Sequence, residues 1–111
     1  MTTTLMDADK NIHCISGDPF ELHLFNINED GETIDFSNWT IHLRAFNANG
    51  NTPIVEFDNS DVDATTPGVL IFKKTAENSK FPIGTYHYDW KMGKPGKELV
   101  TWINNHLFFV E

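Results

Sequence analysis

The sequence predicts a single all-β domain built as an antiparallel sandwich. Apolar and polar residues alternate along several short segments, which is the period of a strand with one buried face. Clusters of Gly, Pro, Asn and Asp separate these segments, as turns separate the strands of a sandwich. No sustained helical period runs through the sequence. These three observations together favour short strands joined by tight turns.

The length and composition also indicate one domain. A chain of 111 residues has single-domain size, and no internal repeat or linker divides it. Its residues are 40% hydrophobic, with nine Phe and three Trp, which is enough for a packed core. We expect residues 1–9, which are mostly polar, to be a flexible arm and residues 10–111 to be the sandwich domain.

The N-terminal third predicts two strands and a hairpin turn. Residues 11–16 form the first strand, and a Ser-Gly-Asp-Pro turn leads into a second strand at residues 20–28. Phe25 falls on the polar face of this second strand, so we expect a bulge or a local cover there. Asp30-Gly31 is a strong hairpin signal.

The middle of the chain predicts a corner and two further strands. Phe36 and Trp39 are expected to close one end of the core from this corner. Residues 40–47 alternate apolar residues with His and Arg, as a half-buried strand does. Residues 53–57 form a short strand, and the proline at its start, Pro53, is typical of a sheet edge.

The C-terminal part contains the clearest alternation. An apolar run predicts a strand at residues 68–74, and residues 75–80 predict one helical turn. Residues 85–92 alternate strictly, and residues 98–110 form a final strand with an interruption near Asn104. The total is about seven strands, the number typical of an immunoglobulin-like sandwich.

No pattern in the sequence predicts a catalytic residue, a cofactor or a metal site. Nucleophile-elbow and phosphate-loop motifs are absent, and no two histidines have the His-x-x-x-His spacing. His13 and Cys14 are neighbours on a strand, so they point to opposite faces and cannot easily act together. Cys14 is interpreted as a small buried apolar residue. The acidic loop at residues 58–63 only partly resembles a calcium loop.

The charge of the chain argues against two classes of partner. The net charge is −8, with 8 Lys and Arg against 16 Asp and Glu. A nucleic-acid binder needs a basic surface, and anionic lipid attracts cations, so neither partner is expected. No apolar run has the length of a membrane helix, and the N-terminus does not read as a signal peptide. We therefore expect synthesis in the cytoplasm without export by the usual route.

The sequence offers candidate contact residues of two kinds. One is the predicted edge strand together with one tryptophan, and comprises Pro53, Ile54, Val55, Glu56, Phe57 and Trp102. The other is a set of tryptophans, because exposed coplanar indoles would suit stacking against sugars. Trp90 shares a face with two tyrosines and is expected in the core, whereas Trp102 shares a face with Val100 and is the best candidate for an exposed contact.

The order of several short motifs resembles a known family. In chain order they are the Gly17-Asp18 turn, the Asp30-Gly31 turn, Asp35-Phe36-Ser37-Asn38, the strand at Gly68-Val69-Leu70-Ile71, and Phe81-Pro82-Ile83-Gly84-Thr85-Tyr86-His87-Tyr88-Asp89-Trp90. The third looks like an Asp-Leu-Thr-Gly corner and the last like a Leu-Pro-x-Gly-x-Tyr-x-Tyr-Asp segment. Together they resemble the small immunoglobulin-like domains of tailed-phage virion proteins, such as the N-terminal domain of baseplate upper proteins. The resemblance covers roughly residues 10–110. Phe36 stands where the family usually has Leu, and Asn38 where it has Gly.

The resemblance implies a structural role. A virion structural or adaptor protein would contact other virion proteins, in many copies or as a homo-oligomer, and the family brings no catalytic residues. Family members usually continue into a receptor-binding or trimerising region, so a free-standing copy suits an adaptor, a decoration protein or a tail accessory subunit. Gly84 is expected to allow a sharp turn, and Tyr86 to bond a backbone group across that corner, as a tyrosine corner does. A carbohydrate-binding module with exposed aromatic residues is the alternative.

Overall fold

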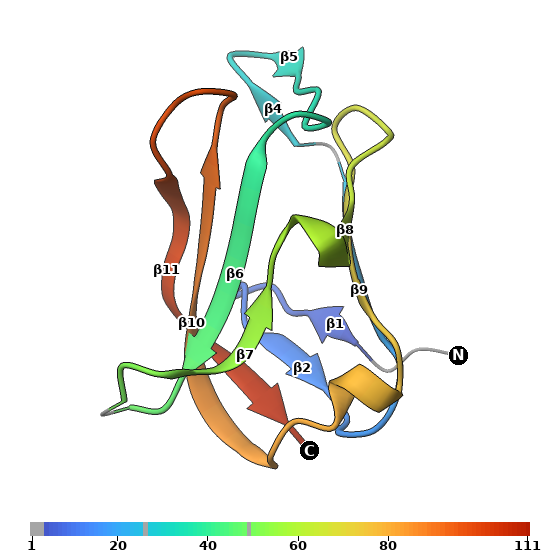
Figure 1. Ribbon diagram of the computed structural model, residues 1–111, viewed down its shortest axis with the longest axis vertical. Helices are drawn as coiled ribbons and strands as arrows, with labels where there is room; N and C mark the ends of the chain where they lie inside the picture. The colour runs from blue at the N-terminus through green and yellow to red at the C-terminus, as the bar shows by residue number, and fades with distance from the viewer. Residues whose placement is uncertain (1–3, 26, 49) are drawn as a thin grey trace.

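The computed structural model describes residues 4–25, 27–48 and 50–111, and they form an all-β sandwich (Figure 1). The larger sheet has the strand order β1 (Leu5–Met6), β2 (Ile12–Cys14), β11 (Val100–Val110), β10 (Gly84–Gly93), β6 (Thr40–Phe46) and β7 (Pro53–Phe57). The smaller sheet has the order β3 (Phe20–Leu24), β9 (Leu70–Lys74) and β8 (Val62–Asp63). A separate hairpin joins β4 (Asn28–Glu29) to β5 (Glu32–Thr33).

The pairing of the strands supports the predicted sandwich. Neighbouring strands are antiparallel except for β2 and β11, which are parallel. Placing β3, β9 and β8 in one sheet and β6, β10 and β11 in the other is the grouping expected of an immunoglobulin-like sandwich. Seven strands of the described chain, β2, β3, β6, β7, β9, β10 and β11, contain three residues or more, which agrees with the predicted number.

The core lies between the two sheets and is rich in aromatic residues. Along β10 the side chains of Tyr86, Tyr88, Trp90 and Met92 are all buried, as the alternation predicts. Six phenylalanines of the described chain have buried side chains, and they come from strands of both sheets and from loops: Phe20, Phe36, Phe57, Phe72, Phe81 and Phe108. Burying a side chain of this size contributes roughly 1.5–3 kcal/mol. The aromatic content therefore explains how a chain without a disulfide holds its two sheets together.

The turns carry the local signals that the sequence predicts. Asp30 and Gly31 both have positive φ angles, 53° and 81°, as the turn of a tight two-residue hairpin requires. The expected helical turn is the 3₁₀ helix η2 (Glu77–Ser79). The acidic loop contains a second 3₁₀ helix, η1 (Asn59–Asp61), which Asp58 caps by accepting from the backbone N of Ser60.

The predicted corner at Tyr86 is present, but glycine is needed next to it for another reason. Tyr86 Oη donates to the carbonyl oxygen of Pro82 at 2.6 Å. Gly84 is not among the glycines with positive φ. A Cβ at this position would instead lie 3.2 Å from Tyr86 Oη, so glycine leaves room for the tyrosine ring. At the other predicted corner, Phe36 is buried and its ring packs edge to face on Trp39 at 4.8 Å.

Three segments differ from the sequence-based expectation. Leu5 and Met6 of the expected flexible arm form β1, because they pair with β2, whereas residues 1–3 lie outside the described chain. The predicted second strand ends at Leu24, and Phe25 beyond it is 62% exposed rather than covered. The expected interruption near Asn104 is a bulge within one continuous strand, where Asn105 has a φ of 56°. None of the described helices is long and apolar enough to cross a membrane.

A candidate binding cleft beside strand β3

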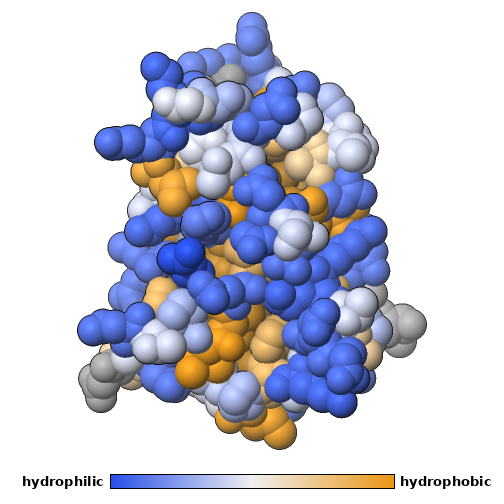
Figure 2. Space-filling view, viewed as in Figure 1, coloured by the Kyte–Doolittle hydropathy of each residue, from blue (hydrophilic) through white to orange (hydrophobic). Residues whose placement is uncertain are grey.

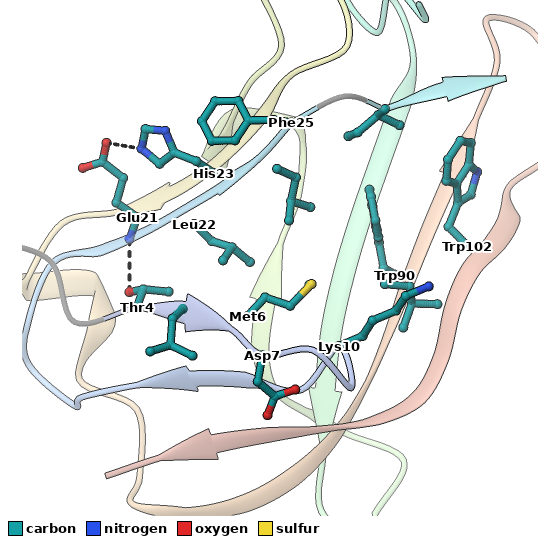
Figure 3. A pocket seen from close by; sticks show the side chains of 14 residues that line it. Thr4, Met6, Asp7, Lys10, Glu21, Leu22, His23, Phe25, Trp90 and Trp102 are labelled. Carbon is teal, nitrogen blue, oxygen red and sulfur yellow. Dashed lines mark hydrogen bonds and ion pairs between the residues drawn. The ribbon is translucent and has the colours of Figure 1, made fainter. Parts of the chain in front are cut away.

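A cleft of about 830 Å³ opens between β1, β3 and the inner face of the larger sheet (Figure 3). We call it the β3 cleft, and it is lined by Thr4, Leu5, Met6, Asp7, Lys10, Glu21, Leu22, His23, Leu24, Phe25, Ile27, Trp90, Trp102 and Ile103. Figure 3 shows β3 along one side, the segment from Thr4 to Lys10 below it, and Trp90 and Trp102 on the opposite side. The cleft is thus the gap at one open side of the sandwich.

The cleft exists because β1 pairs with β2 instead of with β3. Leu5 and Met6 join the larger sheet through His13 and Ile12. Near the beginning of β3 the two segments still touch, since Thr4 Oγ1 accepts from the backbone N of Glu21 at 3.3 Å. In the described part of the chain, no strand pairs with β3 on the side away from β9. The smaller sheet therefore ends in an unpaired edge.

The direction of the β3 backbone follows from this one hydrogen bond. The N–H of Glu21 points to Thr4 and hence away from β9. In an antiparallel pair, alternate residues direct their N–H and C=O groups to the same side. The N–H and C=O of His23 consequently also point to the free edge, whereas those of Leu22 and Leu24 bond to β9. This edge can hydrogen-bond to another extended chain.

The charged side chains of the cleft differ in how they are paired. Glu21 Oε1 lies 2.7 Å from His23 Nε2, and Asp7 Oδ2 lies 2.9 Å from His13 Nε2. Asp7 also accepts from backbone N–H groups of the following turn, and its hydrogen bonds, that to His13 first, lower the pKa of its carboxyl group. Lys10 Nζ, by contrast, has no ion-pair partner among the residues that the structure describes.

The predicted contact residue Trp102 lies at the edge of an aromatic cluster. Its ring centroid is 5.8 Å from that of Trp90, 6.2 Å from Phe36 and 6.2 Å from Trp39. Trp102 is half-buried, whereas Val100 is 61% exposed. The two do not share one environment, because the pairing of β10 with β11 shifts between Trp90 and Lys91. The expected exposed contact is thus a partly covered wall of the cleft.

The rings of Trp39 and Trp102 do not form a flat sugar-stacking surface. They meet edge to face, with an angle of 71° between their planes. The core position expected for Trp90 is confirmed, since it is 5% exposed. Its Nε1 atom is buried without a hydrogen-bond acceptor in the described structure. An unsatisfied buried donor of this kind costs about 1–3 kcal/mol.

The predicted edge strand 53–57 is β7, and it does lie at the edge of the larger sheet. Val55 and Phe57 are each 1% exposed and contribute their side chains to the core. Pro53 and Ile54 are half-buried, and Glu56 is exposed with its carboxylate 3.3 Å from Nε of Arg44. Figure 2 shows that apolar side chains form separate patches between polar ones on this face of the molecule. Only the backbone and three of the five side chains of β7 are available for contact.

Cys14 and His13 are not placed to react together. Cys14 is buried, and burial raises the pKa of its thiol to about 11, so it is protonated at neutral pH. His13 faces away from it and stacks on Phe109 at 4.7 Å. Across the described ranges, no three His, Cys, Asp or Glu side chains come together as metal ligands would.

Comparisons with protein-family models, with curated proteins and with solved structures find no significant match to this chain. The β3 cleft was not predicted from the sequence. Its one local signal was Phe25, an aromatic residue on the polar face of its strand.

Proposed function

We propose that the chain is a non-enzymatic structural or adaptor protein of a tailed-phage virion that acts through contacts with other virion proteins. The observation that carries a binding role is the unpaired edge of β3 beside an apolar cleft. Open sheet edges accept strands from other chains, and concave apolar surfaces accept their side chains. The phage setting is supported by the motifs at Gly17-Asp18, at 35–38 and at 81–90.

The edge of β7 is a second surface for such contacts. Five residues of strand and the three available side chains form a small area, and interfaces well below about 800 Å² per partner are weak on their own. A many-copy assembly would add such weak contacts together through avidity. The net charge of −8 would keep the free chains soluble in the host cytoplasm before assembly.

Mass spectrometry of purified particles tests this proposal. Virions of the virus that encodes the chain are separated on a density gradient, and peptides of this chain are quantified relative to the major capsid protein. We expect the chain to sediment with the particles in a fixed number of copies. Recovery only from the soluble fraction of infected cells would contradict a virion role. Light scattering and electron microscopy of the purified chain then show whether it forms a defined oligomer.

A carbohydrate-binding module is the second candidate. Trp39 and Trp102 border a hollow of about 430 Å³, together with Lys94, Lys97, Glu98 and Thr101, and mixed aromatic and polar side chains suit sugars. The 71° angle between the two indoles disfavours a platform. If this candidate holds, a glycan array gives binding that Trp102→Ala abolishes without unfolding the domain.

A further inference from the structure

We propose that the free edge of β3 accepts an extended segment of a partner protein as an added strand. This segment would place an apolar side chain in the β3 cleft and a carboxylate beside Lys10. The inference rests on the proposed function, because it states the chemistry of the partner that such an adaptor binds. It goes beyond that function in choosing β3 rather than β7 as the recognition edge.

The backbone of β3 supplies the hydrogen bonds. The N–H and C=O groups of His23 point to the free edge, since the N–H of Glu21 does so and alternate residues share a direction. Thr4 lies at this edge beside Glu21, whose N–H it accepts. From His23 onward, no described strand lies on that side. An added strand would therefore extend the smaller sheet from three strands to four.

The cleft supplies a place for alternate side chains of the added strand. Side chains of successive residues point to opposite faces of a sheet, so every second residue of the partner would point into the cleft. There it would meet Met6, Trp90, Trp102 and Ile103, of which Trp90 and Ile103 are buried. Phe25 lies at the upper rim in Figure 3 and would cover the residue that enters. Apolar side chains are thus favoured at these positions.

The charge of the cleft favours a carboxylate on the partner. Both acidic side chains that line it, Asp7 and Glu21, are already bonded to histidines. Lys10 alone among its charged groups has no counter-ion in the described structure. A partner carboxylate near Lys10 would pair this ammonium group. A second copy of the chain fits less well, because each copy carries a net charge of −8.

A selection from short random peptides tests the proposal with the full-length chain. Peptides displayed on yeast are selected on the immobilised protein, and the enriched ones are synthesised and titrated. We expect apolar residues at alternate positions and an acidic residue among them. His23→Pro should weaken binding by at least about tenfold, because it removes the edge N–H and places a ring there, yet leaves the bonds to β9. His23→Ala is the matched control, since it removes the same side chain and its contact with Glu21 but keeps the N–H, and it should bind at least about tenfold more tightly than His23→Pro.

The proposed contact between Lys10 and a partner carboxylate is tested by a second pair of variants. Lys10→Gln should weaken peptide binding about two- to fivefold, as expected for an exposed ion pair, and Lys91→Gln should not. N-methylation of alternate peptide amides should abolish binding, which tests the added strand even if His23→Pro fails to fold.

Four results with the variants and peptides would overturn the proposal, and one mapping result would do so as well. The four are the absence of any enriched peptide, equal binding by His23→Pro and His23→Ala, tolerance of N-methylation at every position, and a self-association of the chain that His23→Pro abolishes. Peptides whose NMR perturbations map to Pro53–Phe57 would also overturn it, but they would leave the proposed protein-binding function standing.

Discussion

The two ends of β3 lie in different surroundings, although each carries a phenylalanine. Phe20 at the start is 2% exposed, and its ring lies 4.7 Å from Phe57 and 6.0 Å from Phe108. Phe25, just beyond the end, is 62% exposed at the rim of the cleft. The larger sheet covers the first end, whereas the side chain just beyond the second end lies mostly in solvent, although Leu24 still pairs with β9 there. The difference shows that one edge strand can contribute a ring to the core at one end and leave a ring in solvent just beyond the other.

The largest expected effect is a difference in stability between alanine variants of these two phenylalanines. Phe20→Ala should lower the free energy of unfolding by about 3–5 kcal/mol, because it leaves a cavity in a packed aromatic cluster. Phe25→Ala should change the same quantity by less than about 0.5 kcal/mol, since the side chain is mostly in water. Urea denaturation followed by tryptophan fluorescence measures both. Similar losses for the two variants would mean that the open end is packed after all.

A smaller effect is expected at the two buried tyrosines. Tyr88 Oη donates to the carbonyl oxygen of Lys10 at 2.6 Å and so ties the core to the turn below the cleft, whereas Tyr86 bonds to Pro82 elsewhere. Tyr88→Phe and Tyr86→Phe should each cost about 1 kcal/mol of stability, the usual net value of one hydrogen bond. Only Tyr88→Phe should speed amide exchange at Asp7, whose N–H donates to the carbonyl oxygen of Asn11 at the base of the β1–β2 hairpin. Equal exchange in both variants would show that this bond does not hold the cleft wall.

The smallest expected effect is that low pH loosens the hairpin between β1 and β2 without unfolding the core. Hydrogen bonds from His13 and from the turn lower the folded-state pKa of Asp7 below its ordinary value of 3.8. Their stabilisation is present above that value and is lost as pH falls through the lower folded pKa. We expect faster exchange of the Asp7 N–H, which donates to the carbonyl oxygen of Asn11, under these conditions and before the core unfolds. Asp7→Asn should show this loosening already at neutral pH, and Asp9→Asn should not.

Much of the fold could be predicted because its signals are local. The alternation at residues 85–92, the Asp30-Gly31 hairpin and the hydrogen bond of Tyr86 each depend on residues close together in sequence. The burial of Trp90 and Cys14 follows from the same alternation.

The cleft could not be predicted because it depends on which strand pairs with β1. Leu5 and Met6 pair with β2 across the Asp7–Asn11 turn, and no local pattern excludes pairing with β3 instead. The place of Trp102 depends on a register shift in β11 that the sequence does not mark. The pairing of β1 and the register shift in β11 are both determined by tertiary packing, which strand propensities alone do not predict.

The most direct test of the open edge is the amide exchange rate of His23 in the free chain, measured by NMR against its two neighbours. Leu22 and Leu24 bond to β9 and should exchange slowly, whereas the N–H of His23 points to the free edge and should exchange fast. Binding of a selected peptide should then slow His23 alone. If His23 exchanges as slowly as Leu22 and Leu24 before any partner is added, the edge is already covered, and β3 is not a binding edge.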